Sequence, residues 1–185
     1  MKDKEQVIKT TKLWLERFVI GLNLCPFAKH PFRNNKIRYV VFEDTDLEKL
    51  TEILLLEANE LVSTTPSVLE TTLIILPEAL EDFQEYLDFL NMAEFIFAEV
   101  ELEGIIQLAS FQPDYQFDET EITDVENYTN RSPFPMFHLL REDSITNALE
   151  AYPEVGDIPE NNIETMNKLG ATRVKQMLDD IIRTN

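Results

Sequence analysis

Cysteine occurs once in this chain, at Cys25, and histidine only twice, at His30 and His138. Cys25 precedes Pro26, a residue that suits the first turn of a helix, so we expect the thiol to lie at a helix start. There the helix dipole and nearby basic side chains favour the thiolate and lower the pKa of the thiol. Cys25 is therefore a candidate catalytic nucleophile, and His138 is the candidate group that moves its proton. The alternative is a buried thiol, because free cysteine is often part of a hydrophobic core.

Residues 127–142 read Asn-Tyr-Thr-Asn-Arg-Ser-Pro-Phe-Pro-Met-Phe-His-Leu-Leu-Arg-Glu and bring unlike polar groups close together. The second half of this segment is expected to open a helix that runs from 135 to 151. On a helix, His138, Arg141 and Glu142 share one face, because they are three and four residues apart. The spacing predicts a cluster of groups that could act on one ligand.

Two arginines in this segment suggest an anionic ligand. Arg131 and Arg141 could hold a carboxylate or a phosphate through paired hydrogen bonds. Asn130 and Ser132 are further candidates for contacts with the same substrate. The alternative is that the arginines pair with acidic side chains of the protein itself, such as Asp124, and fix the loop.

Several chemistries lack the residues that they need. No His-x-x-x-His or Cys-x-x-Cys spacing occurs, so we expect no metal site. The only glycines are at positions 21, 104, 156 and 170, too far apart for a phosphate-binding loop or a dinucleotide fingerprint. We therefore expect no bound cofactor.

The elements that must position these groups alternate between strand and helix. Short β-branched and aromatic runs at 37–42, 71–76 and 104–111 predict strands, and helical patterns at 46–62 and 78–102 separate them. Further expected elements are a helix at 6–20, loops at 29–33 and 112–135, a proline-containing turn at 152–159, and two C-terminal helices divided at Gly170.

This order predicts an α/β protein with one globular domain over residues 1–185. We expect a small, mainly parallel sheet of about three central strands, flanked by helices, with a long loop after the third strand and a helical C-terminus. Ligands of such sheets bind beyond the carboxyl ends of the strands, which is where the long loop would leave.

Charge is distributed unevenly along the chain, whose 16 Lys and Arg and 35 Asp and Glu give a net charge of −19. Residues 1–40 carry a net charge of +6, whereas residues 41–127 carry −22, with Lys49 as their only cation. Such an acidic body repels nucleic acid and anionic membranes, so neither is an expected partner. The basic N-terminal region of one copy could dock on the acidic middle of another, which makes a homo-oligomer possible. The single cysteine and the lack of an apolar N-terminal signal favour a cytoplasmic location.

Three blocks of the sequence belong together: Asn23-Leu-Cys-Pro-Phe-Ala28, Gln107-Leu-Ala-Ser-Phe111 with the following Pro113 and Tyr115, and residues 127–142. Together they resemble an uncharacterised bacterial family, domain of unknown function 1415. The resemblance runs nearly end to end but implies no established reaction. In the family pattern histidine follows Ser-Phe, where this chain has Gln112, which can form hydrogen bonds but cannot titrate. Cys25, Arg131, His138 and Arg141 lie inside the matching blocks.

Two hypotheses follow from these residues. In the first, Cys25, His138 and the two arginines form an enzyme-like site for a small anionic molecule, where segment 23–28 meets segment 127–142. In the second, the protein is a non-catalytic module in which the arginines anchor an acidic metabolite or a partner's carboxylates. Cys25 is then part of the core, and the aromatic-rich loop forms a protein interface.

Overall fold

The computed structural model describes residues 3–151 and 157–184. Its strands are β1 (Ile37–Val41), β2 (Thr71–Ile75), β3 (Ile106–Phe111) and β4 (Met136–Arg141). Its helices are α1 (Lys4–Trp14), which continues as the π-helix η1 (Leu15–Ile20), α2 (Lys29–Arg33), α3 (Leu47–Ser63), α4 (Phe83–Glu99), the 3-10 helix η2 (Val125–Thr129), α5 (Glu142–Ala151), α6 (Ile158–Leu169) and α7 (Ala171–Arg183). The mixed α/β class and the helical C-terminus are therefore confirmed; residues 152–156 of the predicted turn lie outside the described residues.

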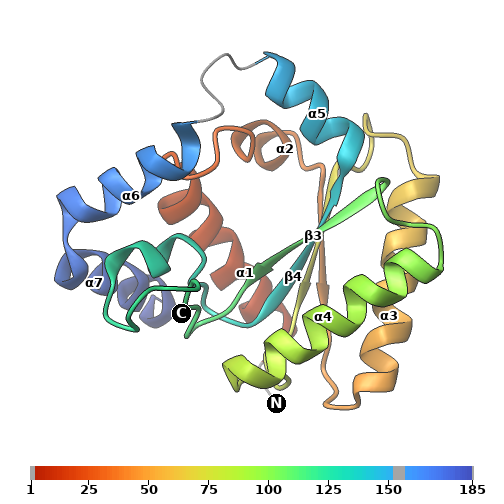
Figure 1. Ribbon diagram of the computed structural model, residues 1–185, viewed down its shortest axis with the longest axis horizontal. Coiled ribbons are helices and arrows are strands. Elements are labelled where there is room, and N and C mark those ends of the chain that lie inside the picture. Colours follow the sequence, from red (N-terminus) through yellow and green to blue (C-terminus); the bar gives the residue numbers. More distant parts are fainter. Residues whose placement is uncertain (1–2, 152–156, 185) are drawn as a thin grey trace.

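The sheet has the strand order β1-β2-β4-β3 and is mixed, so the prediction of a mainly parallel, three-stranded sheet was wrong. β1 pairs in parallel with β2, whereas β4 lies antiparallel between β2 and β3. The three predicted strands do run in one direction. β4 lies between β3 and the other two predicted strands, so two of the three strand pairings are antiparallel (Figure 1).

The predicted helix over 135–151 begins only at Glu142, because Met136–Arg141 forms β4. A short apolar run is compatible with either a helix or a strand, and here both neighbouring strands supply hydrogen-bonding partners. Two smaller differences occur elsewhere. Residues 29–33 form the short helix α2 rather than a loop, and α4 begins at Phe83, after the N-cap residue Asp82.

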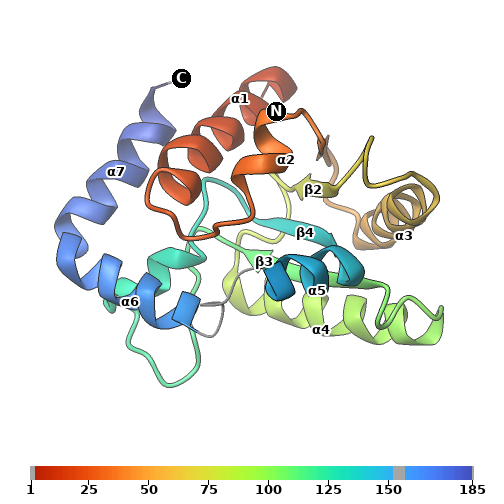
Figure 2. The same ribbon diagram turned by 90° about the horizontal axis from the view of Figure 1, so that it is seen from above.

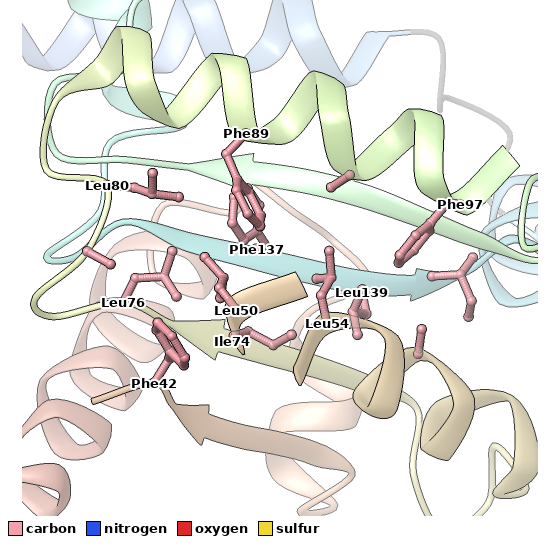
Figure 3. Close-up of a cluster of buried hydrophobic side chains, with 14 of the residues drawn as sticks. Phe42, Leu50, Leu54, Ile74, Leu76, Leu80, Phe89, Phe97, Phe137 and Leu139 are labelled. Atoms are coloured by element: carbon pink, nitrogen blue, oxygen red, sulfur yellow. The ribbon is translucent and has the colours of Figure 1, made fainter. Parts of the chain in front are cut away.

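One face of the sheet, here called the α3/α4 face, is covered by α3 and α4 (Figures 1 and 2). Phe137 of β4 lies at the centre of this core. Its ring stacks on that of Tyr86, with 4.9 Å between the ring centres, and is tilted against that of Phe89, at 5.4 Å. Figure 3 shows how leucine and phenylalanine side chains of both helices meet isoleucine, leucine and phenylalanine side chains of the strands. This core is mainly apolar, but the buried side chains of Thr72 in β2 and Glu57 in α3 lie on the same face.

The opposite face, here called the α1/α7 face, is covered by α1 and η1, and α7 packs beside α1 (Figure 2). Its core joins the two ends of the chain, since Trp14 and Phe18 pack in one cluster with Val174 and Leu178. The strands contribute alternate residues to the two faces, so that Met136 belongs to this cluster and Phe137 to the other. The residues predicted to carry chemistry must be placed relative to these two faces.

Candidate functional site

His138 lies in β4, and its side chain is on the α1/α7 face because it alternates with Phe137 and Leu139. Its Nε2 atom lies 2.5 Å from the hydroxyl oxygen of Thr71 in the neighbouring strand. That hydroxyl donates its only proton to the carbonyl oxygen of Leu139, at 2.6 Å. The hydroxyl oxygen must then accept a proton from Nε2–H, so the neutral imidazole leaves Nδ1 without a proton.

Burial lowers the pKa of His138 from 6.5 to about 4. The cause is the loss of water around the charged form, which disfavours the imidazolium ion. His138 is therefore neutral at pH 7 and holds a proton-free Nδ1. Within residues 3–151 and 157–184, no hydrogen bond engages that Nδ1 atom. The arrangement can accept a proton, although the low pKa makes it a weak base.

Cys25 is a free cysteine between η1 and α2, partly buried against the cluster on the α1/α7 face. Burial raises the pKa of its thiol, and this outweighs the opposing hydrogen bonds from the backbone of Phe27 and Ala28. The prediction of a lowered pKa was therefore wrong. α2 begins only at Lys29, four residues beyond the cysteine, and the dipole of a helix acts mainly within its first turn.

Cys25 and His138 lie on the same side of the sheet. The His138 ring is 6.3 Å from that of Phe111, and both Cys25 and Phe111 pack against the cluster on the α1/α7 face. No hydrogen bond joins the thiol to the imidazole in the described part of the chain. The structure brings the two residues to one core without showing a direct cysteine–histidine pair.

Arg131 is buried, with 9% of its surface exposed, and its guanidinium group binds the long loop from inside. Nε donates to the carbonyl oxygen of Tyr115 at 3.1 Å, and Nη2 donates to that of Ile122 at 2.8 Å. The guanidinium carbon lies 4.5 Å from the centre of the Tyr128 ring. The carbonyl oxygen of Arg131 accepts a bond from the indole of Trp14 at 3.2 Å. Arg131 thus connects two parts of the long loop with each other and with α1.

Arg141 lies on the other face of the sheet. In a strand, residues three apart point to opposite sides, so the predicted shared face of His138 and Arg141 was wrong. One terminal nitrogen of Arg141 donates to the carbonyl oxygens of Leu61, Thr64 and Leu69. These carbonyls lie at and beyond the C-terminal end of α3, where helices leave such groups without partners. The two arginines therefore do not converge, and both bind backbone carbonyls rather than the acidic side chains considered above.

The two polar candidates next to Arg131 also bind the backbone. Asn130 donates from Nδ2 to the carbonyl oxygen of Ser110 at 3.1 Å, and its own carbonyl accepts from the N–H of Gln112 at 3.2 Å. The hydroxyl of Ser132, which is fully buried, donates to the carbonyl oxygen of Phe134 at 2.7 Å. Ser132 shapes the turn into β4, whereas Asn130 joins the loop to the end of β3.

Gln112, which stands where histidine is usual in the family pattern, is completely buried. Its side-chain nitrogen donates to the carbonyl oxygen of Glu81 at 2.8 Å, and its side-chain oxygen accepts from the N–H of Asp114. Both ends of the amide are thereby used. In this chain the position links the start of the long loop to the segment before α4.

A cavity of about 400 Å³ lies between the long loop and the N-terminal half of α6. The loop contributes Phe117, Thr120, Glu126, Thr129 and Asn130, and α6 contributes Ile158, Pro159, Asn162 and Ile163. Of the six predicted site residues, only Asn130 lines it. Hydroxyl, amide and carboxylate groups thus face one apolar-walled space, the usual composition of a small-molecule site.

The cavity lies beside the Cys25 segment, because Asn162 donates from Nδ2 to the carbonyl oxygen of Leu24 at 3.0 Å. Segments 23–28 and 127–142 were predicted to meet. In the structure α6 contacts both of them, which the sequence did not indicate. The only signal was the amide pair Asn161 and Asn162 beside Ile163 in an otherwise ordinary helix. Such a pair is too common to single out.

The loop wall of the cavity is held by Asn127, which is fully buried. Its side-chain oxygen accepts from the N–H of Phe117 and from the hydroxyl of Thr120, each at 2.9 Å, and its Nδ2 donates to the carbonyl oxygen of Glu121 at 2.8 Å. Three bonds from one amide give the part of the loop before η2 a defined shape without regular secondary structure.

In the described residues, no three His, Cys, Asp or Glu side chains are grouped as metal ligands would be. None of the helices described here has the length and apolar character needed to cross a membrane.

The fold and the cavity define a small mixed α/β protein with one ligand-sized hollow beside its long loop. A family model described as "Protein of unknown function (DUF1415)" matches residues 6–176, so the chain belongs to that family. No curated protein and no solved structure matches it.

Proposed function

We propose that the protein binds a small polar molecule in the cavity between the long loop and α6. The observation that carries this proposal is the cavity itself, whose volume of about 400 Å³ is in the range of ligand sites. Thr129, Asn130 and Asn162 offer hydroxyl and amide groups that can form hydrogen bonds with a ligand. Phe117 and Ile163 supply the apolar contact that such a ligand also needs.

The charge of the lining favours an uncharged ligand. Among the described residues that line the cavity, Glu126 alone has an ionisable side chain, and its carboxylate would repel an anion. Neither Arg131 nor Arg141 lines it, and both guanidinium groups already bind carbonyl oxygens. The ligand class is thus a neutral molecule that carries hydroxyl or amide groups.

The test is a screen of small neutral polyols and amides, with small carboxylates and phosphates as comparison, followed by amide chemical shifts of the labelled protein. We expect neutral compounds to shift Thr129, Asn130 and Asn162. Ile163→Trp, which fills the cavity, should abolish the shifts. Ile182→Trp is the matched control, because Ile182 is similarly exposed (45% against 41%) but lies on α7, outside the lining. Binding that survives Ile163→Trp, or that is limited to anions, would contradict the proposal.

A second proposal retains chemistry at Cys25 and His138, with an anionic molecule as substrate and Arg131, Asn130 and Ser132 as the residues that would bind it. Arg141 takes no part in it, because its side chain lies on the other face of the sheet. The specific observation in its favour is His138, which is held by Thr71 with a proton-free Nδ1. A base oriented by a third group is the arrangement that activates a nucleophile. Against it stands the thiol's raised pKa, which leaves little thiolate at pH 7.

Alkylation with iodoacetamide separates the two proposals. An activated Cys25 should react faster than free cysteine at pH 7, and His138→Gln should slow the reaction. A rate below that of free cysteine, unchanged in His138→Gln, would remove Cys25 as a nucleophile and leave the binding module.

A further inference from the structure

A second hollow lies outside the α3/α4 face, between the N-terminal halves of α3 and α4, with a volume of about 450 Å³. Leu47, Phe89 and Met92 form its apolar part, and Leu47 and Met92 are 43% and 40% exposed. Phe95, three residues after Met92 on α4, extends this row and is 65% exposed. Exposed apolar side chains arranged along a helix are typical of a groove that receives another helix.

Acidic side chains border the same groove. Glu48, Glu85 and Asp88 line it, and within the described residues no Lys or Arg pairs with them. Lys49, the only cation in residues 41–127, lies 2.5 Å from Asp44 and 3.9 Å from Asp46 instead. The carboxylates at the rim of the groove are therefore not neutralised by a described cation of the protein and could pair with a cationic partner.

A second copy of this chain does not fit the groove well. Its basic region is residues 1–40, but no large hydrophobic side chain among residues 3–40 is exposed. Such a region could satisfy the acidic rim, but it would offer Leu47 and Met92 only side chains that are themselves largely covered, such as Ile8 and Leu13 of α1. The partner must offer both kinds of group on one segment.

We propose that the groove between α3 and α4 binds an amphipathic basic helix of another protein. The apolar side of that helix would cover Leu47, Met92 and Phe95, and lysines or arginines at its edges would face Glu48, Glu85 and Asp88. Methionine is suited to this contact, because its flexible side chain adapts to different partners.

The probe is a fluorescein-labelled synthetic peptide of about 15 residues, long enough to form a helix when bound, with leucine at helical spacing and lysine elsewhere. Fluorescence anisotropy with the full-length protein should show saturable binding that weakens as salt rises. The triple variant Glu48→Gln, Glu85→Gln, Asp88→Asn should lower the affinity about tenfold, and Met92→Ser should do the same.

Two controls match these variants. Glu101→Gln, Glu103→Gln, Glu119→Gln removes as many exposed charges from the same acidic region outside the groove, and Ile105→Ser removes an apolar side chain that is 47% exposed. Each should change the affinity less than about twofold. Equal losses in the groove and control variants would overturn the proposal, because they would mean unspecific attraction to an acidic surface. Self-association that the groove triple variant abolishes in sedimentation would also overturn it, in favour of a second copy.

Discussion

The two faces of the sheet are built in different ways. The core of the α3/α4 face comes from one continuous stretch, from Phe42 to Ile106, together with two residues of β4. The core of the α1/α7 face joins residues from both ends of the chain, and buried polar groups such as Thr11, Thr71 and Arg131 lie at or beside it. The first face is thus a core made from one stretch of the chain, whereas the second joins both ends of the chain and lies beside the candidate residues Cys25, Arg131 and His138.

The largest expected effect lies on the α3/α4 face. Phe137→Ala removes a fully buried ring that packs against Tyr86 and Phe89, and a cavity of that size costs about 3–5 kcal/mol of unfolding free energy. Urea denaturation measures this cost. Phe111→Ala on the other face, where the ring is only partly buried, should cost less. Equal losses of unfolding free energy in the two variants would mean that the core of the α1/α7 face is as sensitive to the loss of a ring as that of the α3/α4 face.

The α1/α7 face should instead respond to pH through His138. The unfolded histidine takes up a proton near pH 6.5, the folded one only at about 4, so the unfolded state binds more protons in between. The stability due to neutral His138 is present above pH 6.5 and is lost as pH falls toward 4. The full loss is about 3 kcal/mol, from 1.36 kcal/mol for each pKa unit.

Denaturation from pH 4.5 to 7 of the natural chain and of His138→Gln isolates this contribution, since the carboxylates titrate in both proteins. The difference between the two unfolding free energies should grow with pH and level off near pH 7. A difference that does not depend on pH would show that His138 titrates normally and would weaken its role in the second proposal.

Arg131→Lys should have the next largest effect. Lysine keeps the charge but cannot reach two carbonyl oxygens in different directions or stack flat on Tyr128. We expect a loss of about 2 kcal/mol, because two backbone carbonyls of the loop lose charged donors. Faster proteolysis in residues 115–130 should accompany it. A lysine variant as stable as the natural chain would mean that the bonds from the guanidinium group to the loop add little to stability.

The sequence predicted the α3/α4 face better than the α1/α7 face for a physical reason. The periodic patterns of apolar residues predict best those elements that pack on their neighbours in the sequence. This holds for the α3/α4 face, because β1, α3, β2, α4 and β3 follow one another along the chain. β4 was missed because its six residues fit a strand or a helix equally well. Its true partners, β2 and β3, lie far away in the sequence.

The candidate site was predictable only in part. The polar character of residues 127–132 could be read directly, and Asn130 does line the cavity. The sequence could not predict which acceptors the two guanidinium groups bind. They bind backbone carbonyls such as those of Tyr115 and Leu69, and every residue of a chain has a carbonyl. The role of Asn162 depends on how α6 packs, which no local pattern reveals.

The smallest expected effect concerns the N-caps of the two helices on the α3/α4 face. Asp82 accepts bonds from the N–H groups of Gln84 and Glu85, whereas Asp46 accepts only that of Glu48. Asp82→Ala should therefore cost about 1 kcal/mol, and Asp46→Ala less. Because both caps lie away from the α1/α7 face, the pKa of His138 measured by NMR should stay at about 4 in both variants. A shifted His138 titration in either variant would mean that the two faces are coupled through the sheet and that stability and site cannot be altered separately.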